Sequence, residues 1–220
     1  MTESYTTRTR QPSATDQLIN IADQALRTVF GKPQTTGRTY PAQAVPEADL
    51  TTKQRNLHAR LMRINHTGEV CAQGLYQGQA LTARDPQIRA TLQHAAAEEN
   101  DHLAWCEQRI QQLGGRLSVL NPLWFAGSFA LGACAGAFGD RWSLGFVAET
   151  ERQVEGHLGK HLVQIAPEDQ PTRCIIEQMQ TDEMAHGAQA REQGGVDLPV
   201  PIQLIMQASS RVMTTAVYYC

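Results

Sequence analysis

The sequence lacks paired cysteines and any excess of basic residues. Its five cysteines are scattered and form no CxxC motif, which argues against a disulfide framework, a zinc ribbon or a rubredoxin-type site. The formal net charge is −3, and no basic stripe is present to attract nucleic acid. We therefore expect free thiols in a reducing compartment and no nucleic-acid partner.

Long hydrophobic runs are also scarce. Residues 1–15 are polar and do not have the apolar core of a secretory signal. The most apolar stretch, residues 120–138, contains Asn121, Pro122 and three glycines, and its length is close to the lower limit of about 17–25 residues for a membrane span. We expect this stretch to form a buried helix or an apolar surface that dips into a bilayer.

Alternating patterns typical of β-strands are absent as well, whereas helical spacing of apolar residues recurs along the chain. The sequence therefore predicts an all-α protein. A polar arm over residues 1–48 precedes the main domain at residues 49–220, and the arm carries one short amphipathic helix and an irregular linker over residues 34–46. The expected helices run from Asp16 to Arg27, from Asp49 to about Ala83, from Pro86 to Gly114-Gly115, from Trp142 to Ile165, from beyond Pro171 to Gly194-Gly195, and from Pro201 to the C-terminus.

Start signals and glycines add detail to this pattern. Asp49, Asp85 and Asp140 stand where N-cap residues are expected, and Pro86 follows Asp85 at the first helical position. The helix after Asp49 contains three glycines, each of which costs about 1 kcal/mol relative to alanine. Close approach of another helix would offset this cost, so we expect that helix to be central; the glycines are Gly68, Gly74 and Gly78.

Two E-x-x-H motifs carry the clearest chemical signal. Glu99-Asn-Asp-His102 and Glu183-Met-Ala-His186 each lie in the middle of a predicted helix. Positions i and i+3 of a helix project from the same face, so each motif aims a carboxylate and an imidazole at one point. One such motif arises often by chance, but two copies in similarly bounded helices predict a shared site.

A helical bundle that binds two metal ions takes one further Glu from each of two other helices. Glu69 is the only acidic residue between positions 50 and 83, and it precedes Glu99 by 30 positions. The turn at Asp85 lies about midway, so antiparallel helices with legs of roughly 21–24 Å would bring Glu69 level with Glu99 and His102.

The second hairpin offers three candidates for the corresponding carboxylate. Glu149, Glu151 and Glu155 precede Glu183 by 34, 32 and 28 positions, and spacing alone does not choose among them. Four inward-facing carboxylates would be costly to bury, but two divalent cations would neutralise them. Mixed oxygen and nitrogen ligands favour iron or manganese, so the sequence predicts a ferritin-like four-helix bundle with additional apolar and C-terminal helices.

Several segments resemble the demethoxyubiquinone hydroxylases, which are di-iron monooxygenases of ubiquinone biosynthesis. The resemblance covers roughly residues 49–220, with Ser128 standing where a glycine is usual. Its most specific part is the motif Asn65-His-Thr-Gly-Glu69. The other segments that carry it are Ala97-Glu-Glu-Asn-Asp-His102, Glu149-Thr-Glu151, Thr181-Asp-Glu-Met-Ala-His186, the apolar region that begins at Pro122, and Gln207-Ala-Ser-Ser-Arg-Val212.

The resemblance implies a set of site residues. It selects Glu151 over its neighbours and suggests that His157, six positions on, links the site to substrate or to a proton relay. Asp182 is placed to hydrogen-bond a ligand histidine on a neighbouring helix. The implied ligands of two iron ions are Glu69, Glu99, His102, Glu151, Glu183 and His186.

The resemblance also implies a reaction. O₂ would be the co-substrate for hydroxylation of a polyprenylated demethoxyubiquinol ring, with NADH as an electron donor and no Rossmann domain. Such a substrate predicts a peripheral protein on the cytoplasmic face of the cell membrane, in contact with other ubiquinone-biosynthesis proteins. The alternatives are another ferritin-like oxidase, such as a rubrerythrin-like peroxidase or a tRNA hydroxylase, and an iron-storage protein. The expected membrane-docking residues are Leu123, Trp124, Phe125, Phe129, Leu131 and Phe138.

Overall fold

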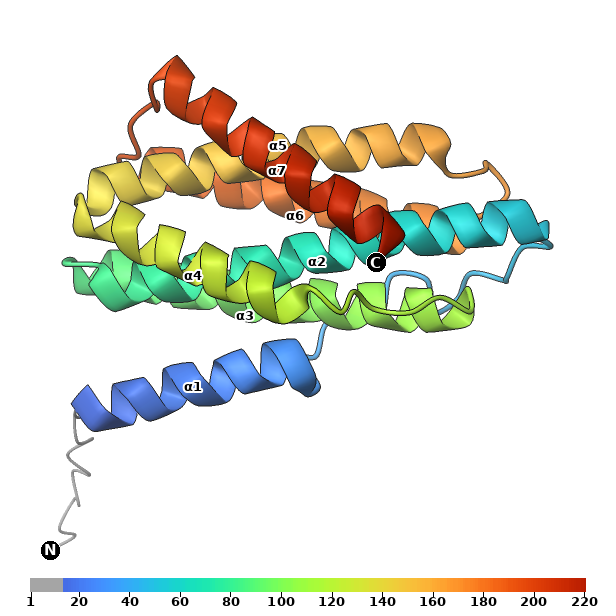
Figure 1. Ribbon diagram of the computed structural model, residues 1–220, viewed down its shortest axis with the longest axis horizontal. Helices are drawn as coiled ribbons and strands as arrows, with labels where there is room; N and C mark the ends of the chain where they lie inside the picture. Colours follow the sequence, from blue (N-terminus) through green and yellow to red (C-terminus); the bar gives the residue numbers. More distant parts are fainter. Residues whose placement is uncertain (1–13) are drawn as a thin grey trace, which may run out of the picture.

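The computed structural model describes residues 14–220, and these residues form seven α-helices and no strand, which confirms the all-α prediction (Figure 1). The expectation that residues 1–15 are a polar segment and not a secretory signal concerns residues that lie mostly outside this range. The helices are α1 (Ala14–Phe30), α2 (Thr52–Thr82), α3 (Pro86–Gln112), α4 (Asn121–Ala137), α5 (Asp140–Gln164), α6 (Gln170–Glu192) and α7 (Val200–Tyr219).

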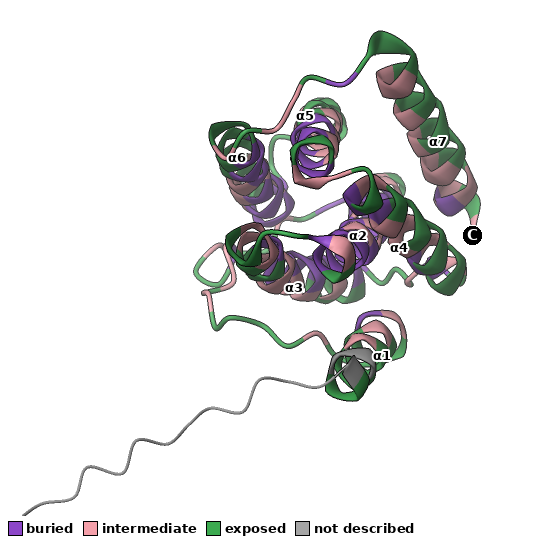
Figure 2. Cartoon of the chain, turned by 90° about the vertical axis from the view of Figure 1, so that its left-hand side faces the viewer, coloured by how far each residue is buried: buried purple, intermediate pink, exposed green. Residues whose placement is uncertain are grey.

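Four of these helices form the core bundle. The hairpin α2–α3 packs against the hairpin α5–α6, and the four helices turn their buried sides toward one another (Figure 2). One apolar cluster surrounds Met62, Ile110 and Ile176, and another surrounds Leu92 and Leu144. Both clusters are built from inward positions of long helices, as the helical spacing predicts. The remaining helices lie around this four-helix bundle (Figure 1).

One of the three predicted N-caps is confirmed. The Asp85 side chain accepts a hydrogen bond of 2.7 Å from the Gln87 backbone N–H, and Pro86 follows it in the first turn of α3. The prediction for Asp49 is wrong, because Thr51 caps α2 in a reciprocal capping box with Gln54.

Asp140 is also not an N-cap. It lies inside the first turn of α5, which begins after Gly139 without a side-chain cap. Its carboxylate instead accepts hydrogen bonds from the backbone N–H groups of Arg84 (3.0 Å) and Asp85 (2.9 Å). Asp140 therefore ties the start of α5 to the turn between α2 and α3.

Glycines let α4 lie directly on α2. A Cβ added at Gly78 would overlap the carbonyl oxygen of Phe129, and one at Gly132 would overlap the carbonyl oxygen of Leu75. Gly74 faces α4 in the same way, which confirms close helix approach at two of the three predicted positions. Gly68 has open space around its Cβ direction, so the prediction is wrong there.

The apolar segment became helix α4, and its side chains divide between two environments. Phe125 is buried against Val70 and Leu103, so its predicted role in a docking face is wrong. Leu123 and Phe138 are 63% and 80% exposed. Among residues 14–220, no helix has the length and hydropathy needed to cross a bilayer.

Helices α1 and α7 lie on the outside. In α1 the residues Ile21, Ala25 and Val29 share one face, and the latter two pack against the cluster of Val70, Leu103 and Phe125. Helix α7 has one buried residue, Val217, and Arg63 of α2 donates hydrogen bonds to the carbonyls of the last turn. Linker residues 31–51 between α1 and α2 contain no helix or strand.

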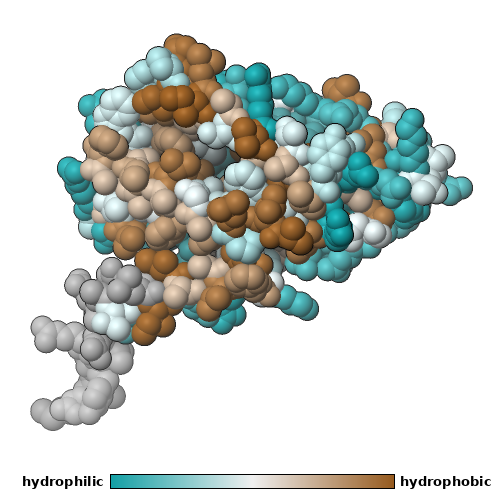
Figure 3. Space-filling model, in the orientation of Figure 1, coloured by the Kyte–Doolittle hydropathy of each residue, from teal (hydrophilic) through white to brown (hydrophobic). Residues whose placement is uncertain are grey.

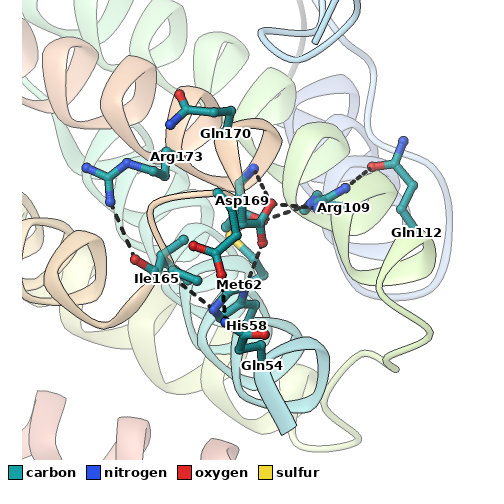
Figure 4. Close-up of polar contacts among 12 residues, drawn as sticks. Gln54, His58, Met62, Arg109, Gln112, Ile165, Asp169, Gln170 and Arg173 are labelled. Atoms are coloured by element: carbon teal, nitrogen blue, oxygen red, sulfur yellow. Dashed lines mark hydrogen bonds and ion pairs between the residues drawn. The ribbon is translucent and has the colours of Figure 1, made fainter. Parts of the chain in front are cut away.

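A buried polar cluster fastens one end of the bundle (Figure 4). Asp169, at the start of α6, accepts hydrogen bonds from His58 of α2 (2.6 Å), Arg109 of α3 (2.8 Å) and Thr172 of α6 (2.7 Å). All four side chains are fully or almost fully buried. Paired and hydrogen-bonded, these groups hold three helices in one register.

Candidate metal centre

The four core helices bring all six predicted ligand residues into the bundle interior. Helix α2 supplies Glu69 and α5 supplies Glu151, while α3 and α6 each supply an E-x-x-H pair. Each of the six residues is at most 7% exposed. The i and i+3 spacing explains why each pair faces one point, and the antiparallel hairpins explain why the four helices meet at one level. The two pairs are Glu99 with His102 and Glu183 with His186.

Four of these residues form a tight group. Ligand atoms of Glu69, Glu99, His102 and Glu183 all lie within 4.8 Å of one another. The His102 Nδ1 atom is 2.7 Å from Glu99 Oε2 and 3.4 Å from Glu183 Oε1. Three carboxylates and one imidazole nitrogen at such distances leave room for a shared cation between them.

The other two residues border this group. His186 Nδ1 lies 3.2 Å from Glu99 Oε1 and 3.6 Å from Glu183 Oε2. The nearby carboxylate of Glu183 helps to raise the pKa of Glu151. Glu149 faces elsewhere and pairs with Arg152 at 2.7 Å.

Both histidines are oriented by a carboxylate outside the group. The His102 Nε2–H donates a 2.9 Å hydrogen bond to Asp182, as predicted, and the His186 Nε2–H donates a 2.9 Å hydrogen bond to Glu98. With the proton on this outer nitrogen, each imidazole would present its Nδ1 lone pair to a metal ion bound in the interior.

Several inward atoms have no hydrogen-bond partner among the described residues. They are both carboxylate oxygens of Glu99, Oε2 of Glu183 and the Nδ1 atoms of His102 and His186. Buried polar atoms are rarely left in this state, because each costs about 1–3 kcal/mol. Oxygen and imidazole donors with free lone pairs fit a metal ion of the iron or manganese type.

The electrostatics of the group agree with this fit. Burial, followed by repulsion from Glu99, raises the pKa of Glu69 well above its usual range. Burial and the nearby carboxylates of Glu183 and Glu99 do the same for the pKa of Glu151. Burial alone would lower the pKa of His186, but the nearby carboxylates of Glu183 and Glu99 raise it to about 12. The group thus retains protons to offset negative charge, and divalent cations would replace them.

The sequence did not single out Tyr76 or Glu98. Tyr76 is 2% exposed and its hydroxyl donates a 2.5 Å hydrogen bond to Glu151. It lies seven positions after Glu69, two turns along the same face of α2, and that spacing was the available signal. Tyr76 also lines a cavity of about 730 Å³ between α1, α2 and α3.

His157 lies on α5, six positions after Glu151. Its ring packs edge-on against His161 with centroids 4.1 Å apart, and its buried Nε2 has no hydrogen-bond partner among the described residues. Burial, and then the charge of Lys160, lowers the pKa of His157. The His161 Nδ1–H lies 2.7 Å from the side-chain oxygen of Asn65. The predicted link from His157 to the site stays a prediction.

Comparison with known proteins identifies the family. The model of the family described as ubiquinone biosynthesis protein COQ7 matches residues 56–217. A 3-demethoxyubiquinol 3-hydroxylase from Nitrosococcus oceani is 54% identical over 210 residues, which are 96% of this chain and 98% of the relative. Relatives with the same name occur in Ralstonia pickettii (56% identity over 214 residues; 92% and 98% of the two chains) and Azoarcus sp. (54% over 203 residues; 92% and 98%). The chain belongs to the COQ7 family of ubiquinone biosynthesis proteins.

Proposed function

We propose that this protein hydroxylates the ring of a polyprenylated demethoxyubiquinol in ubiquinone biosynthesis, with O₂ as co-substrate. The family match and the names of relatives that span nearly the whole chain support the reaction. The observation that carries the chemistry is the buried group of carboxylates and imidazoles with unpartnered inward atoms. A structural bundle would have no reason to bury so many acidic side chains together.

Two iron ions are the proposed cofactor, and six side chains are the proposed ligands. Four carboxylates and two neutral imidazoles would make the site with two divalent cations electrically neutral. When bound, the iron would supply the reduction of O₂ and the insertion of one oxygen atom into the ring. The ligands are Glu69, Glu99, His102, Glu151, Glu183 and His186.

The protein's own contribution is to position these ligands and to exclude water. Asp182 and Glu98 hold the two imidazoles with Nδ1 inward, and Tyr76 orients Glu151 through its hydroxyl. Burial of the site removes water that would otherwise compete for open positions. These contacts fix ligand directions before the substrate arrives.

Each turnover requires two electrons and two protons, because one oxygen atom enters the ring and the other leaves as water. NADH is the proposed donor, which the sequence resemblance supports. Anaerobic addition of NADH to ferric protein, with and without a quinone analogue, tests this proposal by the loss of NADH absorbance. No oxidation of NADH in either sample would remove NADH from the scheme.

The substrate's polyprenyl tail requires contact with a bilayer, and α4 and α7 offer an apolar surface for it. Leu123 and Leu131 of α4 and its C-cap residue Phe138 follow one another at spacings of eight and seven positions, and each is more than half exposed. Ile205, Val212 and Tyr219 follow one another at spacings of seven positions on α7, and each is also more than half exposed. Hydrophobic residues gather on the face that carries these two helices (Figure 3).

We therefore propose peripheral attachment to the cytoplasmic face of the cell membrane through this surface, near other ubiquinone-biosynthesis proteins. Co-sedimentation with liposomes of bacterial lipid composition tests the attachment. The double variant Leu123→Ser/Leu131→Ser should bind at least several-fold less protein than the wild type. Val163→Ser, on α5 and 87% exposed, is the control and should bind as the wild type does. Equal binding of all three proteins would remove this surface from the proposal.

The central experiment combines metal analysis with product formation. Protein purified anaerobically should contain about two irons per chain, as the proposed ligand set requires, and should convert demethoxyubiquinol to the hydroxylated quinol. Glu183→Ala should lose iron and activity together, whereas Glu192→Ala, exposed at the end of the same helix, should keep both. Iron without any quinol hydroxylation would favour a storage or oxidase role, and full activity in Glu183→Ala would refute the ligand assignment.

A further inference from the structure

The linker between α1 and α2 is fastened along the outside of α3 and α6. We define residues 34–48 as the strap. Thr36 donates hydrogen bonds to the buried Asp101 from its backbone N–H (2.9 Å) and its hydroxyl (2.5 Å). At the other end of the strap, Glu47 accepts a 2.6 Å hydrogen bond from Arg109. The strap is therefore held at both ends, with Arg38 in between.

Arg38 contacts both outer neighbours of His102. Its Nη2 donates a 2.7 Å hydrogen bond to Asp182 Oδ2, the same oxygen that accepts from His102 Nε2. Its guanidinium lies 4.9 Å from the centroid of the Trp105 ring, and that ring lies 5.3 Å from the His102 ring. Two separate routes thus lead from one strap residue to one proposed ligand.

The backbone of the strap is shaped for this contact. Gly37, between Thr36 and Arg38, has φ of +90°, a conformation that residues with a side chain rarely adopt. No atom lies within 4 Å of the position that its Cβ would take. The glycine is therefore needed for the turn of the chain and not for space.

Arg38 holds the Asp182 carboxylate in one of several orientations that its side chain could adopt. Asp182 is 16% exposed, and its second oxygen accepts a 3.0 Å hydrogen bond from Gln178 on the same helix. Without a cation beside it, the Asp182 side chain is free to turn toward water and release His102. A planar guanidinium that hydrogen-bonds the carboxylate and stacks on an indole holds it more firmly than an ammonium group would.

We propose that the strap is a positioning element of the metal centre, in which Arg38 holds Asp182 and Trp105 so that His102 keeps its Nδ1 directed inward. This inference rests on the proposed function. It extends beyond the family match, because the matched segment begins at residue 56 and the whole strap precedes it. The N-terminal arm thereby acquires a role at the site.

Anaerobic Fe(II) binding to the full-length protein tests the proposal. Loss of a direct outer partner of a metal-binding histidine typically weakens binding about 10–100-fold, which is the expectation for Asp182→Asn. Arg38 acts one contact further out, so Arg38→Gln should weaken Fe(II) binding roughly 3–10-fold. Gly37→Ala, which leaves every contacting side chain in place, should shift affinity in the same direction. Arg38→Lys should recover part of the loss. Arg27→Gln, in an exposed ion pair of α1, is the matched control.

Mössbauer spectra of the ⁵⁷Fe-loaded proteins provide a readout that a merely structural contact would not move. In Arg38→Gln the spectrum should change for one iron of the pair, the one that His102 serves. Should Arg38→Gln fail to fold, Arg38→Lys and Gly37→Ala carry the same test.

The outcomes separate the two proposals. If Arg38→Gln binds Fe(II) and gives spectra as the wild type does, while Asp182→Asn binds Fe(II) more weakly, the proposed role of the strap is refuted. The proposed metal centre is unaffected by that result. A wild-type protein that binds no iron would overturn the proposed function and the strap with it.

Discussion

Replacement of Asp169 by asparagine should weaken the buried polar cluster shown in Figure 4 and so lower the free energy of unfolding. One carboxylate oxygen accepts from His58 and Thr172, and the other accepts from Arg109 and the Thr172 backbone. An asparagine amide nitrogen accepts nothing, so one of these pairs of donors would face another donor. His58 has no alternative tautomer, because its Nε2 already accepts the backbone N–H of Ala166.

The magnitude follows from burial and charge. Asp169 and Arg109 are both fully buried, and breaking a buried ion pair costs about 3–5 kcal/mol. Asparagine keeps half of the hydrogen bonds, so the lower end, about 3 kcal/mol, is expected. The pKa of Asp169 gives a second measure of its contribution to stability. Burial would raise this pKa, but the hydrogen bonds from His58 and Thr172 and the charge of Arg109 outweigh burial and lower it from 3.8 to about 2. That shift corresponds to about 2 kcal/mol at neutral pH.

Urea unfolding at pH 7 measures the difference, which should correspond to a Tm lower by about 6–12 °C. The pKa of Asp169 is depressed on folding, so its stabilisation is complete above pH 4 and is lost as the pH falls toward 2. The gap between wild type and Asp169→Asn should therefore narrow over that interval. Asp23→Asn, which breaks an exposed ion pair, is the control. An Asp169→Asn protein as stable at pH 7 as Asp23→Asn would refute the reasoning.

Gly132→Ala should destabilise the protein by more than 2 kcal/mol, since the new methyl group overlaps the Leu75 carbonyl, whereas Gly127→Ala, with open space around it, should be neutral or stabilising by up to about 1 kcal/mol. Chemical denaturation of the two variants decides this, and equal stabilities would contradict the close packing of α4 on α2. Tyr76→Phe removes the hydroxyl that donates to Glu151; it should keep its iron but lower kcat about 10–100-fold, and unchanged kcat and Mössbauer spectra would remove Tyr76 from the site.

Local sequence patterns were sufficient to predict the all-α fold, several helix boundaries and the two E-x-x-H pairs. The E-x-x-H pairs face one point because three residues nearly complete a helical turn, and this holds wherever the helix packs. Pro86 after Asp85 and the Gly-Gly pairs at the ends of α3 and α6 set helix boundaries through backbone conformation alone. The all-α fold and the two E-x-x-H pairs therefore followed from the sequence.

Only the tertiary structure shows which side chain of a helix faces the bundle interior, because this depends on how the helix is rotated about its axis against its neighbours. Spacing alone did not choose among Glu149, Glu151 and Glu155. The packing of α5 against α2 turned Glu151 toward Tyr76, while Glu149 pairs with Arg152 of its own helix.

The same limit explains the wrong N-cap at Asp140 and the unforeseen strap, whereas the cap of α2 is the local capping box of Thr51 and Gln54. Asp140 serves a turn that lies 55 positions away in the chain, and Arg38 reaches an aspartate 144 positions away. Contacts between residues so far apart leave no periodic trace in the sequence, because only the packed bundle brings them together.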